Sequence, residues 1–564
     1  MTNNVEKEWF SYYQEGVPSS IEYENKPLQA YLIDAATKHP NKTAVHFLGK
    51  ELTFQELLSR SKRLANSLRE NGLKKSDRVS IMLPNCPQAV ISYYAVLMAG
   101  GVVVQTNPLY MERELEHQLT DSEANIMICL DLVLPKVLKV KNKTMLQHIV
   151  VTKIQDYLPF PKNLLFPLIQ KQKKQGLLVE MPSTDEIHTF KNWVANGSED
   201  DIELDVNPKE DLALLQYTGG TTGLAKGVML THFNLVVNTM QCKNWIPDAK
   251  YGEESVMGIL PFFHVYGMTC VMNLSIMYAA KMIILPKFEP KDTLKAIEKQ
   301  KPTLFPGAPT IYISLLNEPD FDKYDLSSIK ACISGSAPLP IEVQQKFQEK
   351  ITGRLVEGYG LTESSPVTHS NPLSDGTVVG SIGLPWPDTD AKIVLPTGDE
   401  AALKEIGELI VQGPQVMKGY WKRPDETNAV LKDGWLFTGD MAYRDEKGYF
   451  YVVDRKKDMI IAGGYNIYPR EVEEVLYEHP AVQEAVVIGI PDAYRGETVK
   501  AFVVLKQNEK ATEEEMNQFC RKFLAAYKVP RLYEFREELP KTTVGKILRR
   551  VLVDEEKAKK DQSL

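Results

Sequence analysis

A glycine- and threonine-rich segment that directly follows an apolar strand is the feature of this sequence that most constrains its fold. The strand is predicted over residues 212–217, and the segment after it reads Tyr217-Thr-Gly-Gly-Thr-Thr-Gly-Leu-Ala-Lys-Gly227. Glycines let backbone N–H groups approach an anion closely, threonine hydroxyls add hydrogen-bond donors, and Lys226 adds a positive charge. This combination predicts a loop that binds phosphate groups.

The loop is not a Walker A motif, because that motif needs a glycine before its lysine and a serine or threonine after it. Ala225 and Gly227 occupy those two positions here. A flexible surface turn is the alternative interpretation of an isolated glycine pair. A longer stretch that is dense in glycine and threonine and follows a buried-type strand favours phosphate binding.

The first 135 residues alternate between helical and extended patterns. A capping box at Thr53–Glu56 begins a helix whose apolar residues recur at helical spacing up to the stop signal Asn71-Gly72. A strand over 78–83, a helix over 88–98 and a strand over 102–104 follow. This order predicts an α/β fold with substantial parallel strand pairing.

The pattern changes twice further along the chain. Residues 135–210 are rich in proline and lysine and are expected to interrupt the alternation, which resumes at residue 211. Beyond residue 454 the units are shorter, with helices near 469–478 and from Thr512 and strands over 484–489 and 499–505. We therefore predict two domains, 1–454 and 455–564, and a charge-rich tail after Arg550 that frays.

Composition excludes several classes of protein. A chain of 564 residues with 43% hydrophobic residues can form about two to four folded domains and is not a disordered chain. Six cysteines without a CxxC pair indicate a reducing compartment and argue against structural zinc or iron–sulfur clusters. A net charge of −8 gives no reason to expect nucleic acid as a partner.

The sequence shows no signal peptide, and its longest apolar stretch, Val271 to Leu285, is too short to span a bilayer. We therefore expect a cytoplasmic protein without a transmembrane helix. The segment 136–174 qualifies this expectation, because it carries nine lysines against one acidic residue and includes the apolar run 157–169. Two interpretations stay open for it: a solvated connector, and a peripheral contact with an anionic membrane.

With these motifs in place, the chain resembles the AMP-forming adenylate-forming enzymes, which include acyl-CoA synthetases, luciferases and peptide-synthetase adenylation domains. Their loop commonly reads Tyr-Thr-Ser-Gly-Thr-Thr-Gly-x-Pro-Lys-Gly, from which this chain departs at Gly219 and Ala225. Further segments follow in the family's order: Ser334 to Leu339, Glu357 to Ser364, Trp435 to Asp440, Asp454 to Glu473, and Pro540 to Arg550. The resemblance covers roughly residues 25–550 and looks closest to bacterial long-chain fatty acid–CoA ligases.

The resemblance implies an α/β fold with a large N-terminal domain of mixed β-sheets flanked by helices. That domain is expected to include a small β-barrel-like subdomain, and a smaller, mobile α+β domain is expected to follow it. By resemblance, Tyr359 stacks on adenine, Thr362 contacts the α-phosphate, and Asp440 holds the ribose hydroxyls. Glu363 and Thr218 are the expected Mg²⁺ ligands.

The residues expected from this resemblance to contact ATP or AMP are Thr218, Gly219, Gly220, Thr221, Thr222, Gly223, Lys226, Gly335, Ser336, Ala337, Glu357, Gly358, Tyr359, Gly360, Thr362, Asp440 and Arg455. Lys546 matches the family's catalytic lysine of adenylation, and Lys457 falls at the hinge between the domains. Gly463 and Gly464 are expected to face coenzyme A.

The acid-binding side rests on a shorter match, Pro261-Phe-Phe-His-Val-Tyr-Gly267. It makes His264 a second candidate catalytic residue, although a histidine in an aromatic run also fits a satisfied core residue. The apolar side chains and small residues expected to line the acid pocket, together with this histidine, are His264, Val265, Met268 and Gly307.

The resemblance implies a ligase that uses Mg²⁺-ATP to convert a long-chain fatty acid to acyl-AMP and then transfers the acyl group to coenzyme A. The alternatives are a medium-chain or aryl acid as substrate, a carrier-protein thiol as acceptor, a luciferase-like oxygenation, and an AMP-binding regulator without catalysis. The expected partners are therefore fatty acid, ATP and coenzyme A. A homodimer is the alternative to a monomer.

Overall fold

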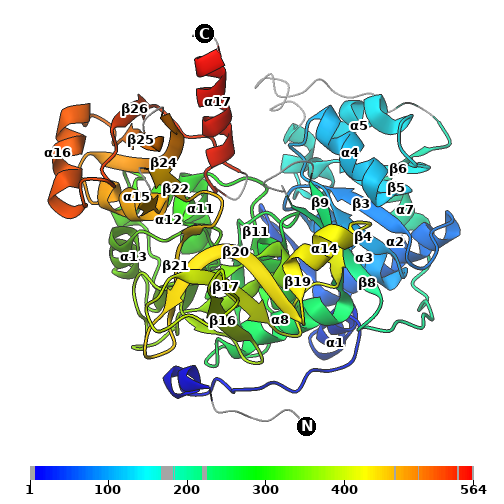
Figure 1. Ribbon diagram of the computed structural model, residues 1–564. Helices are drawn as coiled ribbons and strands as arrows, with labels where there is room; N and C mark the ends of the chain where they lie inside the picture. The colour runs from blue at the N-terminus through cyan, green and yellow to red at the C-terminus, as the bar shows by residue number, and fades with distance from the viewer. Residues whose placement is uncertain are drawn as a thin grey trace.

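The computed structural model describes residues 7–166, 182, 184–218, 225–462, 465–492, 495–542 and 545–561 (Figure 1). Within these residues the strands form five sheets, and helices pack around them. The predicted α/β fold of mixed sheets flanked by helices is confirmed.

The largest sheet carries the two strands that flank the predicted phosphate loop. Its described strands lie in the order β18 (Gly419–Tyr420), β9 (Lys226–Thr231), β8 (Leu212–Thr218), β4 (Val102–Gln105), β3 (Arg78–Met82), β5 (Ile126–Leu130), β6 (His148–Thr152) and β7 (Ile187–Thr189). The strands from β8 to β7 are parallel, whereas β9 and β18 are antiparallel to their neighbours. Parallel strands are covered on both faces, which explains why β4 and β5 are apolar and fully buried.

Two further sheets have four described strands each. One has the order β10 (Ser255–Gly258), β11 (Lys281–Ile284), β1 (Thr43–Phe47) and β2 (Lys50–Thr53). The other has the order β12 (Ala331–Ser334), β13 (Arg354–Gly360), β14 (Val367–Ser370) and β15 (Leu384–Pro385). Because β12 and β13 are parallel, the segments at their carboxyl ends emerge at the same edge of the sheet.

A fourth, antiparallel sheet contains β16 (Asp390–Val394), β17 (Gly407–Gln412), β20 (Trp435–Arg444), β19 (Leu431–Lys432) and β21 (Phe450–Arg455). No pairing among these described strands closes them into a barrel, so the sheet is open where we expected a barrel-like subdomain. The fifth sheet contains β23 (Tyr465–Ile467), β22 (Ile460–Ala462), β25 (Gly496–Leu505), β24 (Val482–Asp492) and β26 (Leu532–Arg536).

The helices follow the predicted pattern in the first part of the chain. The capping box at Thr53 and Glu56 is present and begins α2 (Phe54–Glu70). The other described α-helices are α1 (Ala30–Lys38), α3 (Pro87–Met98), α4 (Glu112–Ser122), α5 (Leu134–Lys141), α7 (Phe190–Asn196), α8 (His232–Asn244), α9 (Val265–Gly267), α10 (Leu274–Met277), α11 (Pro290–Gln300), α12 (Pro309–Leu316), α13 (Ile341–Gln348), α14 (Pro424–Val430), α15 (Pro469–Tyr477), α16 (Glu513–Phe523) and α17 (Arg549–Asp561).

Two sequence-based expectations about regular structure are wrong. The described part of residues 135–210 continues the α/β order, since β6 and β7 lie within it and extend the largest sheet, and α7 follows them. The described part of the tail after Arg550, residues 551–561, does not fray but forms most of α17 (Arg549–Asp561). Leu552 explains this helix, because it is fully buried against Val486, Ile488 and Phe502 of the C-terminal sheet.

The apolar core of the larger part of the molecule runs from Trp9 to Phe450, and a separate cluster runs from Ile460 to Tyr533. The division of the chain after residue 454 lies between these two clusters and stays a prediction. In the described part of the chain, no helix is long and apolar enough to cross a membrane.

Candidate active site

The phosphate loop begins and ends on two paired strands. Thr218 closes β8, Lys226 opens β9, and the two residues are antiparallel partners. His117 contacts the carbonyl oxygen of Ala225 through Nε2 at 2.8 Å. The five loop residues expected to bind phosphate, Gly219, Gly220, Thr221, Thr222 and Gly223, lie outside the described residues.

The segment Gly419–Val430 lies against the end of this loop. Tyr420 pairs with Val228 of β9, and the Lys226 ammonium lies 5.1 Å from the centre of the Tyr420 ring. The Lys226 Nζ also lies 3.0 Å from a carboxylate oxygen of Glu426 in α14. The ammonium group of Lys226, the predicted phosphate-binding lysine, is therefore contacted by an aromatic ring and a carboxylate.

The same tyrosine contacts the expected metal ligand. Thr362 and Glu363 form a short 3₁₀ turn, η6 (Thr362–Ser364), and the Tyr420 hydroxyl donates a hydrogen bond to Glu363 Oε1 at 2.7 Å. Among the described residues, none forms a hydrogen bond or ion pair with the second carboxylate oxygen, Oε2. Glu363 therefore has one oxygen fixed and one available to a cation.

The expected adenine-binding segments meet at one edge of the β12–β13 sheet. Gly335, Ser336 and Ala337 follow β12, and Gly358, Tyr359 and Gly360 end β13. Gly307 joins them through a parallel bridge to Ser334. Ser336 has a φ of +72°, a conformation that turns the chain sharply at this edge.

The Glu357 carboxylate contacts two protein partners. Its carboxylate accepts a hydrogen bond from the Leu339 backbone N–H at 3.1 Å and lies 3.6 Å from the guanidinium of Arg470 in α15. Burial raises the pKa of this carboxyl group, and Arg470 opposes that rise. Glu357 therefore connects the expected adenine segment to the C-terminal part of the chain.

Tyr359, Asp440 and Arg455 form a second connected group. The Tyr359 hydroxyl donates to Asp440 Oδ2 at 2.5 Å, and the Arg455 Nε lies 3.5 Å from Asp440 Oδ1. Asp440 and Arg455 are also paired across β20 and β21. The structure thus brings together the residues expected at adenine and ribose.

Lys546 lies in a tight loop of the C-terminal part, near Asp440 and Arg455. The Thr542 hydroxyl accepts from the Lys546 backbone N–H at 3.1 Å, and the Lys546 carbonyl accepts from the Thr542 N–H at 2.7 Å. Gly545 has a φ of +80°, and a Cβ there would lie 1.9 Å from Thr310 Oγ1, so only glycine fits this approach to α12. Burial lowers the pKa of Lys546 to about 8, with Arg455 lowering it further and Asp440 opposing.

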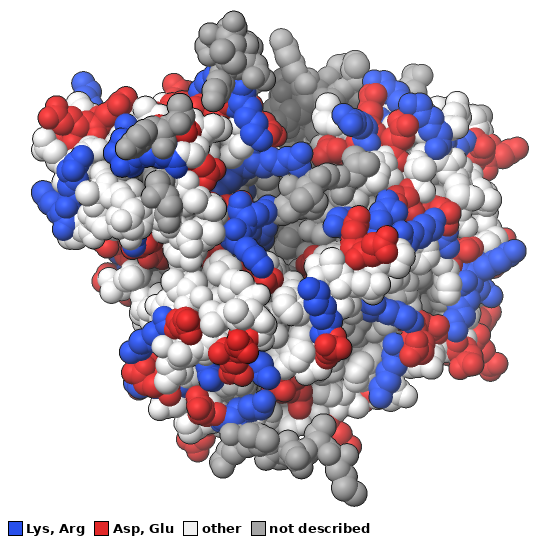
Figure 2. All heavy atoms as spheres, in the orientation of Figure 1, with Lys and Arg blue, Asp and Glu red and all other residues white. Residues whose placement is uncertain are grey.

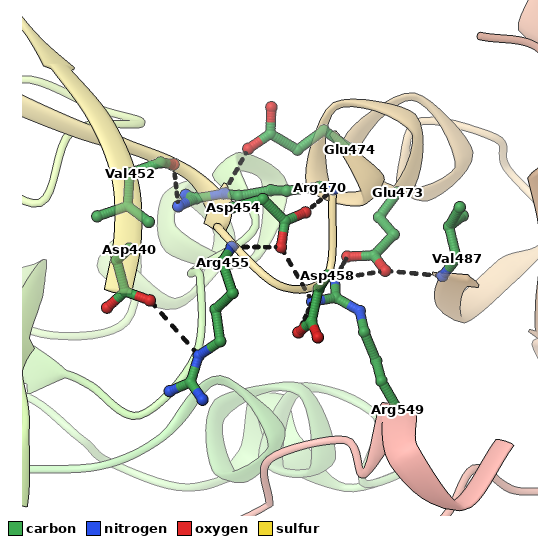
Figure 3. A network of polar contacts seen from close by, with 10 residues as sticks. All are labelled: Asp440, Val452, Asp454, Arg455, Asp458, Arg470, Glu473, Glu474, Val487 and Arg549. Atoms are coloured by element: carbon green, nitrogen blue, oxygen red, sulfur yellow. Dashed lines mark hydrogen bonds and ion pairs between the residues drawn. The ribbon is translucent and has the colours of Figure 1, made fainter. Parts of the chain in front are cut away.

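An ion-pair network places this loop (Figure 3). Arg549, three residues after Lys546, lies 2.7 Å from Glu473, 3.3 Å from Asp454 and 3.6 Å from Asp458. Asp454 also accepts from the backbone N–H groups of Arg455 and Arg470. Burial of the ammonium of Lys457, the expected hinge residue in the same turn, lowers its pKa.

Of the acid-pocket candidates, His264 lies close enough to Lys546 for the charge of the lysine to act on its imidazole. Val265 and Met268 are buried, and His264 Nδ1 accepts a hydrogen bond from the Tyr266 N–H at 3.2 Å. Burial and the Lys546 charge lower the pKa of His264 to about 4, so its imidazole is neutral at pH 7 and its proton lies on Nε2.

Tyr266 and Tyr312 shape the walls of this region. A Cβ at Gly335 would lie 3.1 Å from the Tyr266 ring, and one at Gly307 would lie 2.6 Å from the Tyr312 hydroxyl. Figure 2 shows Lys and Arg side chains gathered beside the hollow between the C-terminal strands and the larger part of the molecule. Gly463 and Gly464, expected to face coenzyme A, lie outside the described residues.

Sequence reasoning did not single out Tyr420, Glu426, Arg470 or Arg549. Tyr420 and Glu426 are about 200 positions from Lys226, and only the antiparallel pairing of β18 with β9 brings them to it. Arg549 follows the catalytic candidate by three positions, and this proximity was the one signal that could have identified it.

Comparison with known proteins identifies the family. The family model for AMP-binding enzymes matches residues 32–421, and the model for the AMP-binding enzyme C-terminal domain matches residues 471–546. The chain is 59% identical to a long-chain-fatty-acid–CoA ligase of Bacillus subtilis (strain 168), over 98% of each chain. It is 41% identical to a protein of the same name from Escherichia coli O157:H7, over 99% of this chain and 100% of that one.

Solved structures agree with this result. The crystal structure of ATP-bound MatB from Rhodopseudomonas palustris is 30% identical, covers 94% of this chain and 99% of its own, and has a TM-score of 0.83. The resemblance stated from the motifs is confirmed. The ordered motifs, the paired sheets and these matches show that the chain belongs to the AMP-binding enzyme family.

Proposed function

We propose that this protein is a long-chain fatty acid–CoA ligase of the AMP-forming type. The observation that carries the proposal is the position of Lys546 beside Arg455 and Asp440, in a chain that is 59% identical over nearly its full length to a ligase of that name. The reaction has two steps and consumes a fatty acid, ATP and coenzyme A. It releases acyl-CoA, AMP and pyrophosphate.

In the first step a carboxylate oxygen of the acid attacks the α-phosphorus of ATP, and the bond to the β-phosphate oxygen breaks. Negative charge develops on the phosphate oxygens, and the ammonium of Lys546 offsets it in a partly buried site where such charges are effective. Lys226 binds the β- and γ-phosphates. The His264 Nε2–H donates a hydrogen bond to the carboxylate of the acid and helps to hold it in line with the α-phosphate of ATP.

In the second step the thiol of coenzyme A loses its proton to solvent, its sulfur attacks the acyl carbonyl carbon, and the bond from that carbon to the phosphate oxygen breaks, which releases AMP. Lys546 blocks this step while it occupies the site. We propose that the domain 455–564 rotates about Lys457 as a unit against the domain 1–454. The rotation withdraws Lys546 and brings Gly463 and Gly464 to the coenzyme A channel.

Mg²⁺ enters with ATP in this proposal. Mg²⁺ prefers oxygen ligands and takes several of them from nucleotide phosphates and water, so it needs few protein ligands. Glu363 Oε2, together with the Thr218 hydroxyl, would hold it. When bound, the cation neutralises phosphate charge.

For the segment 136–174 we propose a membrane contact that is made by apolar side chains and not by Lys139 and Lys143. Lys139 and Lys143 are paired with Glu112 and Glu116, so these lysines do not form a free cationic patch. Phe160 and Leu164, however, are 79% and 65% exposed. We propose that this apolar tip contacts the lipid surface, on a cytoplasmic protein; residues 167–174 lie outside the described residues. A homodimer stays the alternative to a monomer.

The proposed function predicts acid-dependent ATP–pyrophosphate exchange that is strongest with long straight-chain acids, followed by coenzyme A-dependent release of AMP. The assay compares straight-chain acids of increasing length with aryl acids. If exchange is strongest with medium-chain or aryl acids, the substrate is one of those acids and not a long-chain fatty acid. Exchange without dependence on coenzyme A would indicate another acceptor, and no exchange with any acid would favour a regulator.

Lys546→Ala is expected to slow acyl-AMP formation by about 100-fold or more, because the charge that stabilises the transition state is lost. Thioester formation from supplied acyl-AMP should stay within about 3-fold of wild type, since the lysine leaves the site in that step. Lys510→Ala, which removes an exposed lysine of the same domain, is the matched control. Equal loss of both half-reactions would contradict the role of Lys546.

The adenylation rate is expected to decrease at alkaline pH. The folded-state pKa of Lys546 is lowered to about 8, and only its protonated form carries the required charge, so activity is full below pH 8 and is lost above it. kcat/KM for ATP should fall about tenfold per pH unit above about pH 8. Lys546→Arg keeps its charge and should remove this decline; a level wild-type profile to about pH 9.5 would contradict the assignment.

The double variant Phe160→Ser/Leu164→Ser is expected to reduce co-sedimentation with phospholipid vesicles by about 10-fold, because it removes the apolar tip. Lys162 lies within this tip, is exposed and forms no ion pair in the described part of the chain, so the binding should strengthen with anionic lipid and weaken at high salt. Leu403→Ser, which changes an exposed leucine elsewhere on the surface, is the control. Wild-type protein that binds no vesicle at any salt concentration would refute the membrane contact.

A further inference from the structure

The segment that pairs with the phosphate-loop strand places a carboxylate where the nucleotide phosphates are expected. β18 pairs with β9 through Tyr420 and Val228, and the chain then turns at Arg423 into α14. Arg423 lies 3.0 Å from Asp121, which also accepts from the Tyr217 hydroxyl at 2.7 Å. These contacts hold the start of α14 near the end of β8, and Glu426 in its first turn reaches Lys226.

Glu426 is the ion-pair partner of Lys226 among the described residues. The Nζ–Oε2 distance is 3.0 Å, and the side chains are 24% and 42% exposed, respectively. A pair this open to solvent contributes little to stability. The same ammonium is expected to bind the β- and γ-phosphates, and a carboxylate so close to it would repel them. The two anions therefore compete for one cation.

We propose that Glu426 is a displaceable counter-ion of Lys226 that sets the affinity of the enzyme for polyphosphate, meaning ATP and pyrophosphate. Its carboxylate pairs with the lysine when the site holds no nucleotide and separates from the ammonium group when a polyphosphate binds. Adenosine monophosphate has no β- or γ-phosphate, so its affinity should not depend on Glu426. The inference rests on the phosphate-binding role proposed for Lys226, and Glu426 is a positioning residue that acts through that lysine.

The test compares Glu426→Gln with Asp425→Asn in the full-length enzyme. Both variants remove one negative charge from the same helix turn, but Asp425 is exposed and makes no ion pair in the described structure. Glu426→Gln should lower the KM for ATP and the inhibition constant of pyrophosphate by about 3- to 10-fold. kcat for acyl-AMP formation and inhibition by AMP should stay within about 2-fold, and Asp425→Asn should leave all four values within about 2-fold.

Lys226→Met separates this inference from the proposed function. If Lys226 binds phosphate, this variant raises the KM for ATP by about 10-fold or more, and adding Glu426→Gln to it has no further effect. An unchanged KM in Lys226→Met would refute the role of the lysine itself. A raised KM in Lys226→Met together with an unchanged or raised KM in Glu426→Gln would refute only the counter-ion. Equal effects of Glu426→Gln and Asp425→Asn would also refute it, since they would reflect net charge alone.

Discussion

The ion pairs of Arg549 with Asp454, Asp458 and Glu473 are the interaction on which the arrangement of the site depends. Asp454 and Glu473 are buried, and a buried carboxylate is tolerated only when it is paired and hydrogen-bonded. Because Arg549 follows Lys546 by three residues, satisfying those carboxylates also fixes the loop that carries Lys546. The network gathers strand β21, helix α15 and helix α17 around one guanidinium (Figure 3).

A second link, between Arg470 and Glu357, connects the same region to the expected adenine segment. Both side chains are almost fully buried, and Glu357 also holds the backbone of Leu339. The segments expected at adenine and at the catalytic lysine are therefore mechanically connected through paired charges. In the proposed rotation about Lys457 this contact would have to separate, and both charges would then need water or new partners, because an unpaired buried charge is strongly destabilising.

Much of the fold could be predicted from local patterns. The capping box at Thr53, the strand over 212–217 and the helices near 469 and 512 all occur, because caps and apolar periodicity act over a few residues. The expectations for residues 135–210 and for the tail after Arg550 were wrong for a shared reason. Short strands such as β7 and the charged helix α17 gain their stability from the sheets they pack on, which local composition does not reveal.

By itself, the sequence determined the chemical groups of the site and their order along the chain: a lysine after a glycine-rich loop, a tyrosine and an aspartate for the nucleoside, and a lysine near the C-terminus. Only the tertiary structure decided which of these groups meet and what opposes them. It paired Glu357 with Arg470, placed the carboxylate of Glu426 beside Lys226, and lowered the pKa of Lys546 by burial. The physical reason is that charge pairing and desolvation depend on distances in space, and strand pairing brings together residues that lie hundreds of positions apart in the chain.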